Sequence, residues 1–137
     1  MKLINILQLP AYYKDRYKNI NAVNILDFKI DKDFENGSIT CSANTGKYNI
    51  KIMFSGDKIT TDMDIRVDCE CKSFAFEFSK SIRDAGGLIY EDKYPDLVGK
   101  KNKYHLICGC KHLIQFGKFI YQRRIIIEQE IRRINAR

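Results

Sequence analysis

The sequence predicts an α+β fold with an antiparallel β-hairpin in a three-stranded sheet, an inserted helix and loop, and a long C-terminal helix. Apolar residues alternate along residues 39–54 on both sides of a glycine-containing turn, which is typical of a β-hairpin. From Lys111 almost to the C-terminus, apolar residues recur at helical spacing. No glycine-, serine- or proline-rich linker divides the chain, so we expect a single domain over residues 1–137.

The composition is that of a globular protein. Of the 137 residues, 45% are hydrophobic, 30% are charged and only two are proline, which excludes a disordered or low-complexity chain. A chain of this length buries enough surface to fold without a metal or a disulfide. No apolar run reaches the roughly 18 residues that cross a bilayer, and the first apolar stretch is interrupted too early for a signal peptide. We therefore expect an intracellular origin and no membrane partner.

Further elements are expected on both sides of the hairpin. Residues 23–34 are rich in β-branched and aromatic side chains, which favours a strand. Before them, Pro10 suits the first turn of a short helix over residues 11–17. Apolar residues alternate again over residues 63–71, which predicts the third strand of the sheet. Within the hairpin, Cys41 lies on the apolar face, and we expect it in the core.

The segment after this third strand allows two interpretations. Phe74, Phe78 and Ile82 are four residues apart, as on one face of a helix, but Phe74, Phe76 and Phe78 also alternate as in a strand. A helix is favoured because about a dozen residues is long for a strand and a pair of glycines follows. Residues 88–107 show no sustained period and are expected to form an inserted loop.

The final helix is expected to span residues 111–136. Its apolar residues, Ile125 and Ile126 among them, occupy more than the narrow stripe that faces a core. Either a partner covers the surplus, or the helix is buried by its own domain.

Two close pairs of potential metal ligands are present, Cys69 with Cys71 and Cys110 with His112. Three sulfurs and one imidazole are the ligand set of a closed structural zinc site. Residues two apart on a strand share a face, whereas on a helix they lie about 200° apart, so Cys110 is expected just before the final helix. The alternative is that the cysteines are small buried hydrophobic residues.

Two segments resemble the SWIM-type zinc finger, whose pattern is C-x-C, a variable spacer and C-x-H. Residues 67–74 read Val-Asp-Cys-Glu-Cys-Lys-Ser-Phe after a hairpin, and residues 110–113 read Cys-Lys-His-Leu at the start of a helix. The resemblance covers residues 38–122. Its spacer of 38 residues is longer than is usual in the family, which implies an inserted helix and loop and leaves Cys108 and His105 as alternative ligands. It implies one structural Zn²⁺ bound by Cys69, Cys71, Cys110 and His112.

The resemblance implies a DNA-binding or protein-interaction element, because SWIM modules accompany DNA-handling ATPases, transposases and ubiquitin-related proteins. The chain also resembles small stand-alone SWIM-like proteins of tailed bacteriophages. An enzyme is not expected, since four protein ligands leave a zinc ion no open position for a substrate. Glu70 also does not follow a ligand histidine, as the glutamate of zinc deaminases does.

The charge allows two hypotheses about partners. The net charge is +7, and residues 111–137 hold seven basic and two acidic residues. The first hypothesis is an architectural protein of a larger assembly, either a tailed-phage virion or a nucleoprotein complex. The alternative is a DNA- or RNA-binding module without sequence specificity. The cations expected to contact a protein partner or nucleic acid are Lys100, Lys101, Lys103, Lys118, Arg123, Arg124, Arg132 and Arg133.

Overall fold

A four-stranded antiparallel sheet forms the centre of the computed structural model, which describes residues 1–8, 19–94 and 106–137. Each strand pairs with the strand that follows it in the chain, in the order β1-β2-β3-β4. The strands are β1 (Leu26–Lys32), β2 (Ser38–Asn44), β3 (Asn49–Ser55) and β4 (Arg66–Cys69).

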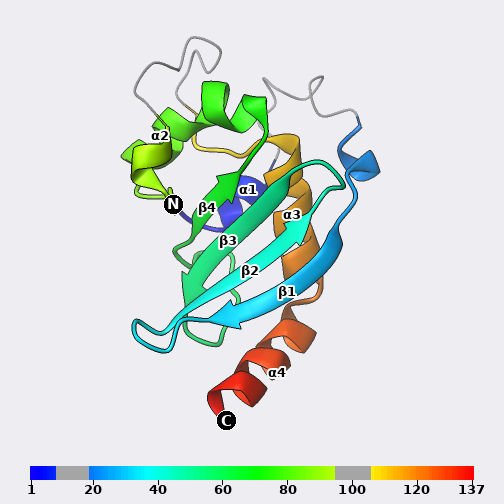
Figure 1. Ribbon diagram of the computed structural model, residues 1–137, viewed down its shortest axis with the longest axis vertical. Coiled ribbons are helices and arrows are strands. Elements are labelled where there is room, and N and C mark those ends of the chain that lie inside the picture. The colour runs from blue at the N-terminus through cyan, green and yellow to red at the C-terminus, as the bar shows by residue number, and fades with distance from the viewer. Residues whose placement is uncertain (9–18, 95–105) are drawn as a thin grey trace.

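The described helices are short, and the longest two follow each other at the C-terminus. Helix α3 crosses behind the sheet in the view of Figure 1, and α4 continues below β1. In the parts of the chain that the structure describes, no helix combines the length and the apolar character needed to span a membrane. The helical segments are α1 (Ile4–Leu7), η2 (Ile20–Ala22), η3 (Phe74–Phe78), α2 (Ser79–Asp84), η4 (Glu91–Lys93), α3 (Lys111–Gln122) and α4 (Arg124–Asn135).

The predicted α+β fold is confirmed, with one strand more than the three-stranded sheet that was expected. The extra strand is β1, which occupies the centre of the segment 23–34 predicted as a strand and pairs with β2. The third predicted strand, residues 63–71, is shortened to β4, because the chain turns away from β3 after Cys69. The helix predicted over residues 11–17 lies outside the described residues.

The core lies between α3 and the face of the sheet that carries Ile39, Cys41, Ile52 and Val67. These four side chains are at most 1% exposed, and Phe116 of α3 is fully buried with them. The core position predicted for Cys41 is confirmed. Burial raises the pKa of its thiol to about 12, so the thiol is neutral at ordinary pH and behaves as a small apolar group.

The ambiguous segment after β4 is helical. It begins with the π-helical turn η3, which continues directly into α2. Phe74, Phe78 and Ile82 are buried on one side, while Phe76 is 53% exposed, as expected for a helix rather than a strand. Gly86 ends the helix with a φ of +70°, a left-handed conformation that favours glycine, and its N–H donates to the carbonyl of Arg83.

The single helix predicted over residues 111–136 is two helices, α3 and α4, separated at Arg123. The backbone of Arg123 leaves helical geometry, with φ −107° and ψ 17°. Its guanidinium donates to the carbonyl of Phe119 at 3.3 Å, and that of Arg124 donates to Tyr121 at 2.9 Å. Each guanidinium also lies over the ring of the same residue. The two arginines therefore satisfy carbonyl groups at the end of α3 and stabilise the break.

Helix α4 is partly buried by its own domain and partly exposed. Ile127, Ile131 and Ile134 are at most 8% exposed, and the Glu128 carboxylate accepts a hydrogen bond from the backbone N–H of Ile59 at 2.8 Å. Ile125 and Ile126, by contrast, are 64% and 69% exposed.

Because α4 has a buried side and an exposed side, replacing isoleucine by alanine should lower the free energy of unfolding by different amounts on the two sides. Ile131→Ala removes a fully buried side chain and should lower the free energy of unfolding by about 2–5 kcal/mol. Ile125→Ala on the exposed side should change it by less than about 0.5 kcal/mol. Urea unfolding of both variants, followed by circular dichroism, measures the difference. Equal effects would contradict the packing of α4 described above.

Candidate metal centre

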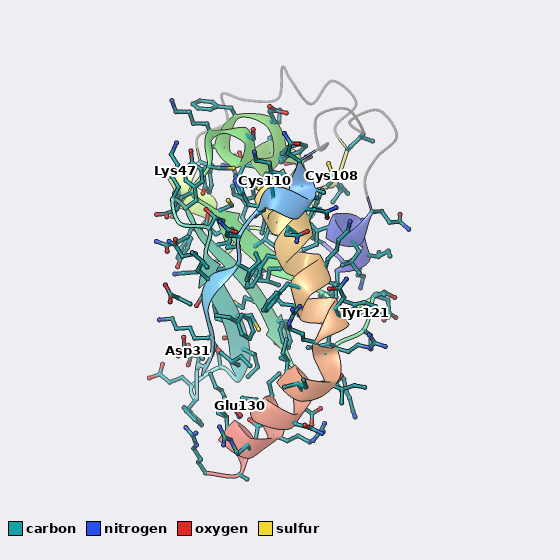
Figure 2. The ribbon with its side chains drawn as sticks, turned by 90° about the vertical axis from the view of Figure 1, so that its right-hand side faces the viewer. Asp31, Lys47, Cys108, Cys110, Tyr121 and Glu130 are labelled. Carbon is teal, nitrogen blue, oxygen red and sulfur yellow. The ribbon has the colours of Figure 1, made fainter. Side chains whose placement is uncertain are left out.

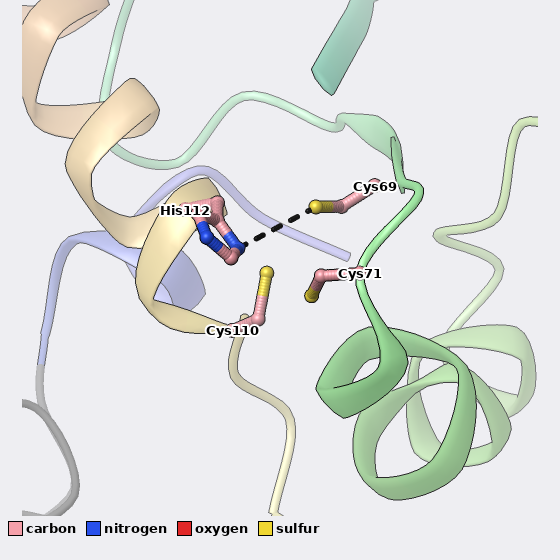
Figure 3. A group of neighbouring side chains, drawn as sticks. All are labelled: Cys69, Cys71, Cys110 and His112. Atoms are coloured by element: carbon pink, nitrogen blue, oxygen red, sulfur yellow. Dashed lines mark hydrogen bonds between the residues drawn. The ribbon is translucent and has the colours of Figure 1, made fainter. Parts of the chain in front are cut away.

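Four potential metal ligands converge where β4 and α3 approach each other. Cys69 is the last residue of β4, and Cys71 follows in the turn before η3. Cys110 is the extended residue immediately before α3, as predicted, and His112 lies in the first turn of that helix. Figure 3 shows the three thiols and the imidazole pointing toward one another from these two segments.

The distances suit a single metal ion. The ligand atoms of the four residues all lie within 4.8 Å of one another, and the Sγ of Cys69 is 3.8 Å from Nδ1 of His112. Ligands at ordinary zinc–sulfur distances in a tetrahedral site are about 3.8 Å apart. The predicted pairs therefore come together as a Cys₃His group that could hold one metal ion.

Hydrogen bonding favours a thiolate at Cys71, whereas burial of the group disfavours charge. The three cysteines are at most 3% exposed, and the backbone N–H of Phe74 donates to the Sγ of Cys71 at 3.3 Å. Hydrogen bonds from Cys110 and Cys69 hold the pKa of Cys71 well below its usual range. Burial raises the pKa of Cys110, as do the neighbouring sulfurs. The close approach of the three sulfurs therefore opposes ionisation of more than one of them, and a bound cation would balance the charge of three thiolates.

Aromatic and basic side chains surround the ligands. The ring of Tyr48, which precedes β3, packs edge-on against His112 with ring centroids 5.3 Å apart. Beside the group lies a cavity of about 560 Å³, whose lining includes Lys47, Lys72 and Lys111. The spacing of residues in the sequence does not predict that Tyr48 lies near the ligands, because its position beside the imidazole depends on the turn between β2 and β3.

A second polar network lies directly behind Cys69. The carboxylate of Asp68 is buried, accepts a hydrogen bond from the hydroxyl of Tyr94 at 2.5 Å, and pairs with Lys93 at 3.1 Å. The Tyr94 hydroxyl also lies 3.2 Å from the carbonyl oxygen of Cys69, and its ring packs against Phe74. Burial and the hydrogen bond to Asp68 raise the pKa of Tyr94. These contacts fix the strand end that presents Cys69.

The alternative ligands are placed differently. Cys108 is buried, but it is not part of the converging group. His105 lies outside the described residues, as do Lys100, Lys101 and Lys103.

The predicted contact cations of α3 and α4 have several environments. Arg123 and Arg124 donate to carbonyls at the end of α3, and Arg133 forms an ion pair with Glu130 at 2.7 Å. Arg132 is exposed and Lys118 is partly buried.

Comparisons of the chain with protein-family models, curated proteins and solved structures found no match.

The geometry predicts which cysteines a metal requires. Cys110→Ala should abolish binding of one divalent ion per chain, because it removes one of four converging ligands. Cys108→Ala, the matched control two residues away, should still bind one ion. Metal analysis of the purified full-length variants measures the stoichiometry. Retention of metal by the first variant and its loss by the second would show that Cys108 is the ligand.

The network behind Cys69 gives a further prediction. Tyr94→Phe removes the hydroxyl that donates to the buried Asp68 carboxylate and should lower the free energy of unfolding by about 1–3 kcal/mol. Tyr90→Phe is the matched control, since the Tyr90 hydroxyl contacts the partly exposed Lys51 and lies at the surface. Denaturant unfolding in saturating zinc compares the two variants. An equal effect of both would mean that the network contributes nothing to stability.

Proposed function

We propose that this chain is a non-enzymatic interaction protein, stabilised by one structural Zn²⁺, that acts as an architectural component of a larger assembly. The proposed ligands are Cys69, Cys71, Cys110 and His112. A tailed-phage virion or a nucleoprotein complex is the proposed setting.

The chemistry of the ligand set supports zinc. Three thiolates and an imidazole form the Cys₃His set of closed structural sites, which leaves no position for a substrate. With three thiolates and one Zn²⁺, the formal charge of the protein falls from +7 to +6, so the basic surface is kept. In small domains such a site contributes on the order of 10 kcal/mol to folding, because the unfolded chain has no preformed site.

The order of elements supports a SWIM-like module. The β2–β3 hairpin precedes the C-x-C pair, Phe74 follows that pair and begins a helical segment, and the C-x-H pair opens α3. This order matches the resemblance drawn from residues 38–122. The phage setting rests on the likeness to small stand-alone proteins of that kind.

One observation carries the architectural role. Two adjacent large apolar side chains, Ile125 and Ile126, are more than half exposed on α4, although three other isoleucines of that helix are buried. Exposed apolar groups that are contiguous on a helix are typical of interaction surfaces. Because α4 also fills part of the core, removing residues 123–137 would damage the domain, and a point substitution is the cleaner test.

Ile125→Lys should release the protein from its assembly while zinc content and folding stay unchanged, because the side chain is 64% exposed. Gln122→Lys, at an exposed polar position nearby, adds the same charge and should have no effect. Both tagged full-length variants are expressed in the native cell, and sedimentation of the lysate through a density gradient measures the bound fraction.

Wild-type protein that sediments alone would contradict the proposal. Association that nuclease removes, and that weakens steeply with salt, would instead support the nucleic-acid-binding alternative.

A further inference from the structure

Strand β1 is an edge strand with an apolar groove beside it. Among the described residues it pairs with β2 alone, so its other side faces away from the sheet. A groove of about 560 Å³ separates β1 from α4, and Phe28, Ile30, Ile126 and Ile127 contribute its apolar lining. In the view of Figure 2, β1 and α4 run side by side, with Asp31 and Glu130 marking the two elements.

We propose that β1 pairs antiparallel with β1 of a second copy of this chain, so that two four-stranded sheets join into one. An exposed edge strand offers unpaired backbone N–H and C=O groups, which favour the addition of another strand. The paired backbone lies on β1 and not on α4, although Ile126 of α4 lines the groove beside it, and the pairing does not require entry into a larger assembly.

Charge complementarity favours a second copy as the partner. Lys29 and Asp31 are exposed and lie on the same face of β1, because they are two residues apart. When Ile30 is placed opposite Ile30 of the second copy, each Lys29 lies opposite an Asp31, and this pairing occurs twice. A shift of two residues places either Lys29 opposite Lys29 or Asp31 opposite Asp31. A shift of one residue would place core-facing residues opposite solvent-facing ones. The sequence of β1 thus selects one register for pairing with itself.

The same register covers the apolar groove. Ile30 meets its counterpart on the face toward the helices. The Nζ of Lys32 donates to Oδ1 of Asn135 on α4 at 2.5 Å, so this lysine stays bound to its own chain. The bulge that would oppose strand addition is confined to the start of the strand, between Leu26 and Lys29, where Asp27 has a φ of 55°. Residues 29–32 keep regular pairing with β2, and no other described strand pairs with them.

A charge exchange tests this interface. Lys29→Asp places a new carboxylate opposite Asp31 twice, and Asp31→Lys places two lysines opposite each other, so each single variant should raise the dimer dissociation constant by about tenfold or more. The double variant Lys29→Asp/Asp31→Lys restores opposite charges and should restore the dimer. Lys58→Asp, at an exposed turn position, makes the same charge change outside the interface and serves as the control.

The experiment is sedimentation equilibrium of the full-length protein with zinc. Wild type, the double variant and the control should reach twice the chain mass of 16.0 kDa, and the single variants should sediment at 16.0 kDa under the same conditions. Circular dichroism and metal content verify that each variant is folded. Wild type that stays at 16.0 kDa at every concentration would overturn the proposal, because β1 would then not pair with a second copy of this chain. Failure of the double variant to restore the dimer would overturn the register.

Discussion

The convergence of two ligand pairs from distant parts of the chain is the contact on which the rest of the structure depends. Cys69 ends β4 and Cys71 follows it, Cys110 precedes α3, and 38 residues separate the two pairs. Joining them holds the start of α3 against the end of β4, and α3 then extends across the apolar face of the sheet (Figure 1). The direction of α3 also sets where α4 begins. A metal ion at this junction would therefore connect every layer of the fold.

The same junction concentrates negative charge, and the surrounding residues accommodate it. The Phe74 N–H donates to one sulfur, Cys110 lies at the positive end of the α3 dipole, and three lysines line the neighbouring cavity. Behind the site, the buried carboxylate of Asp68 is neutralised by Lys93 and hydrogen-bonded by Tyr94. Rigid support of this kind lets three buried sulfurs remain close together with their orientation fixed.

Local patterns in the sequence predicted the ligand pairs, the hairpin and the buried Cys41, because each depends on spacing over a few residues. The break at Arg123 could not be predicted, since the apolar period runs through it: Ile120 and Ile127, seven residues apart, are both buried. At the break, two arginine side chains donate hydrogen bonds to the last carbonyls of α3, and the apolar period gives no sign of these contacts. Tyr94 was missed because it lies in a segment without periodicity, and only the folded chain brings it to Asp68. A strand was predicted over residues 23–34, but its place in the sheet was not, because the pairing of β1 with β2 depends on the folded chain and not on local spacing.

The most direct test of the central contact is X-ray absorption at the zinc edge on natively purified protein. Three sulfur neighbours and one nitrogen neighbour are expected around a single zinc ion per chain, since the cluster offers three thiolates and one imidazole. Protein that contains no zinc, or zinc surrounded mainly by oxygen, would contradict the account, because the junction between β4 and α3 would then be held by packing alone.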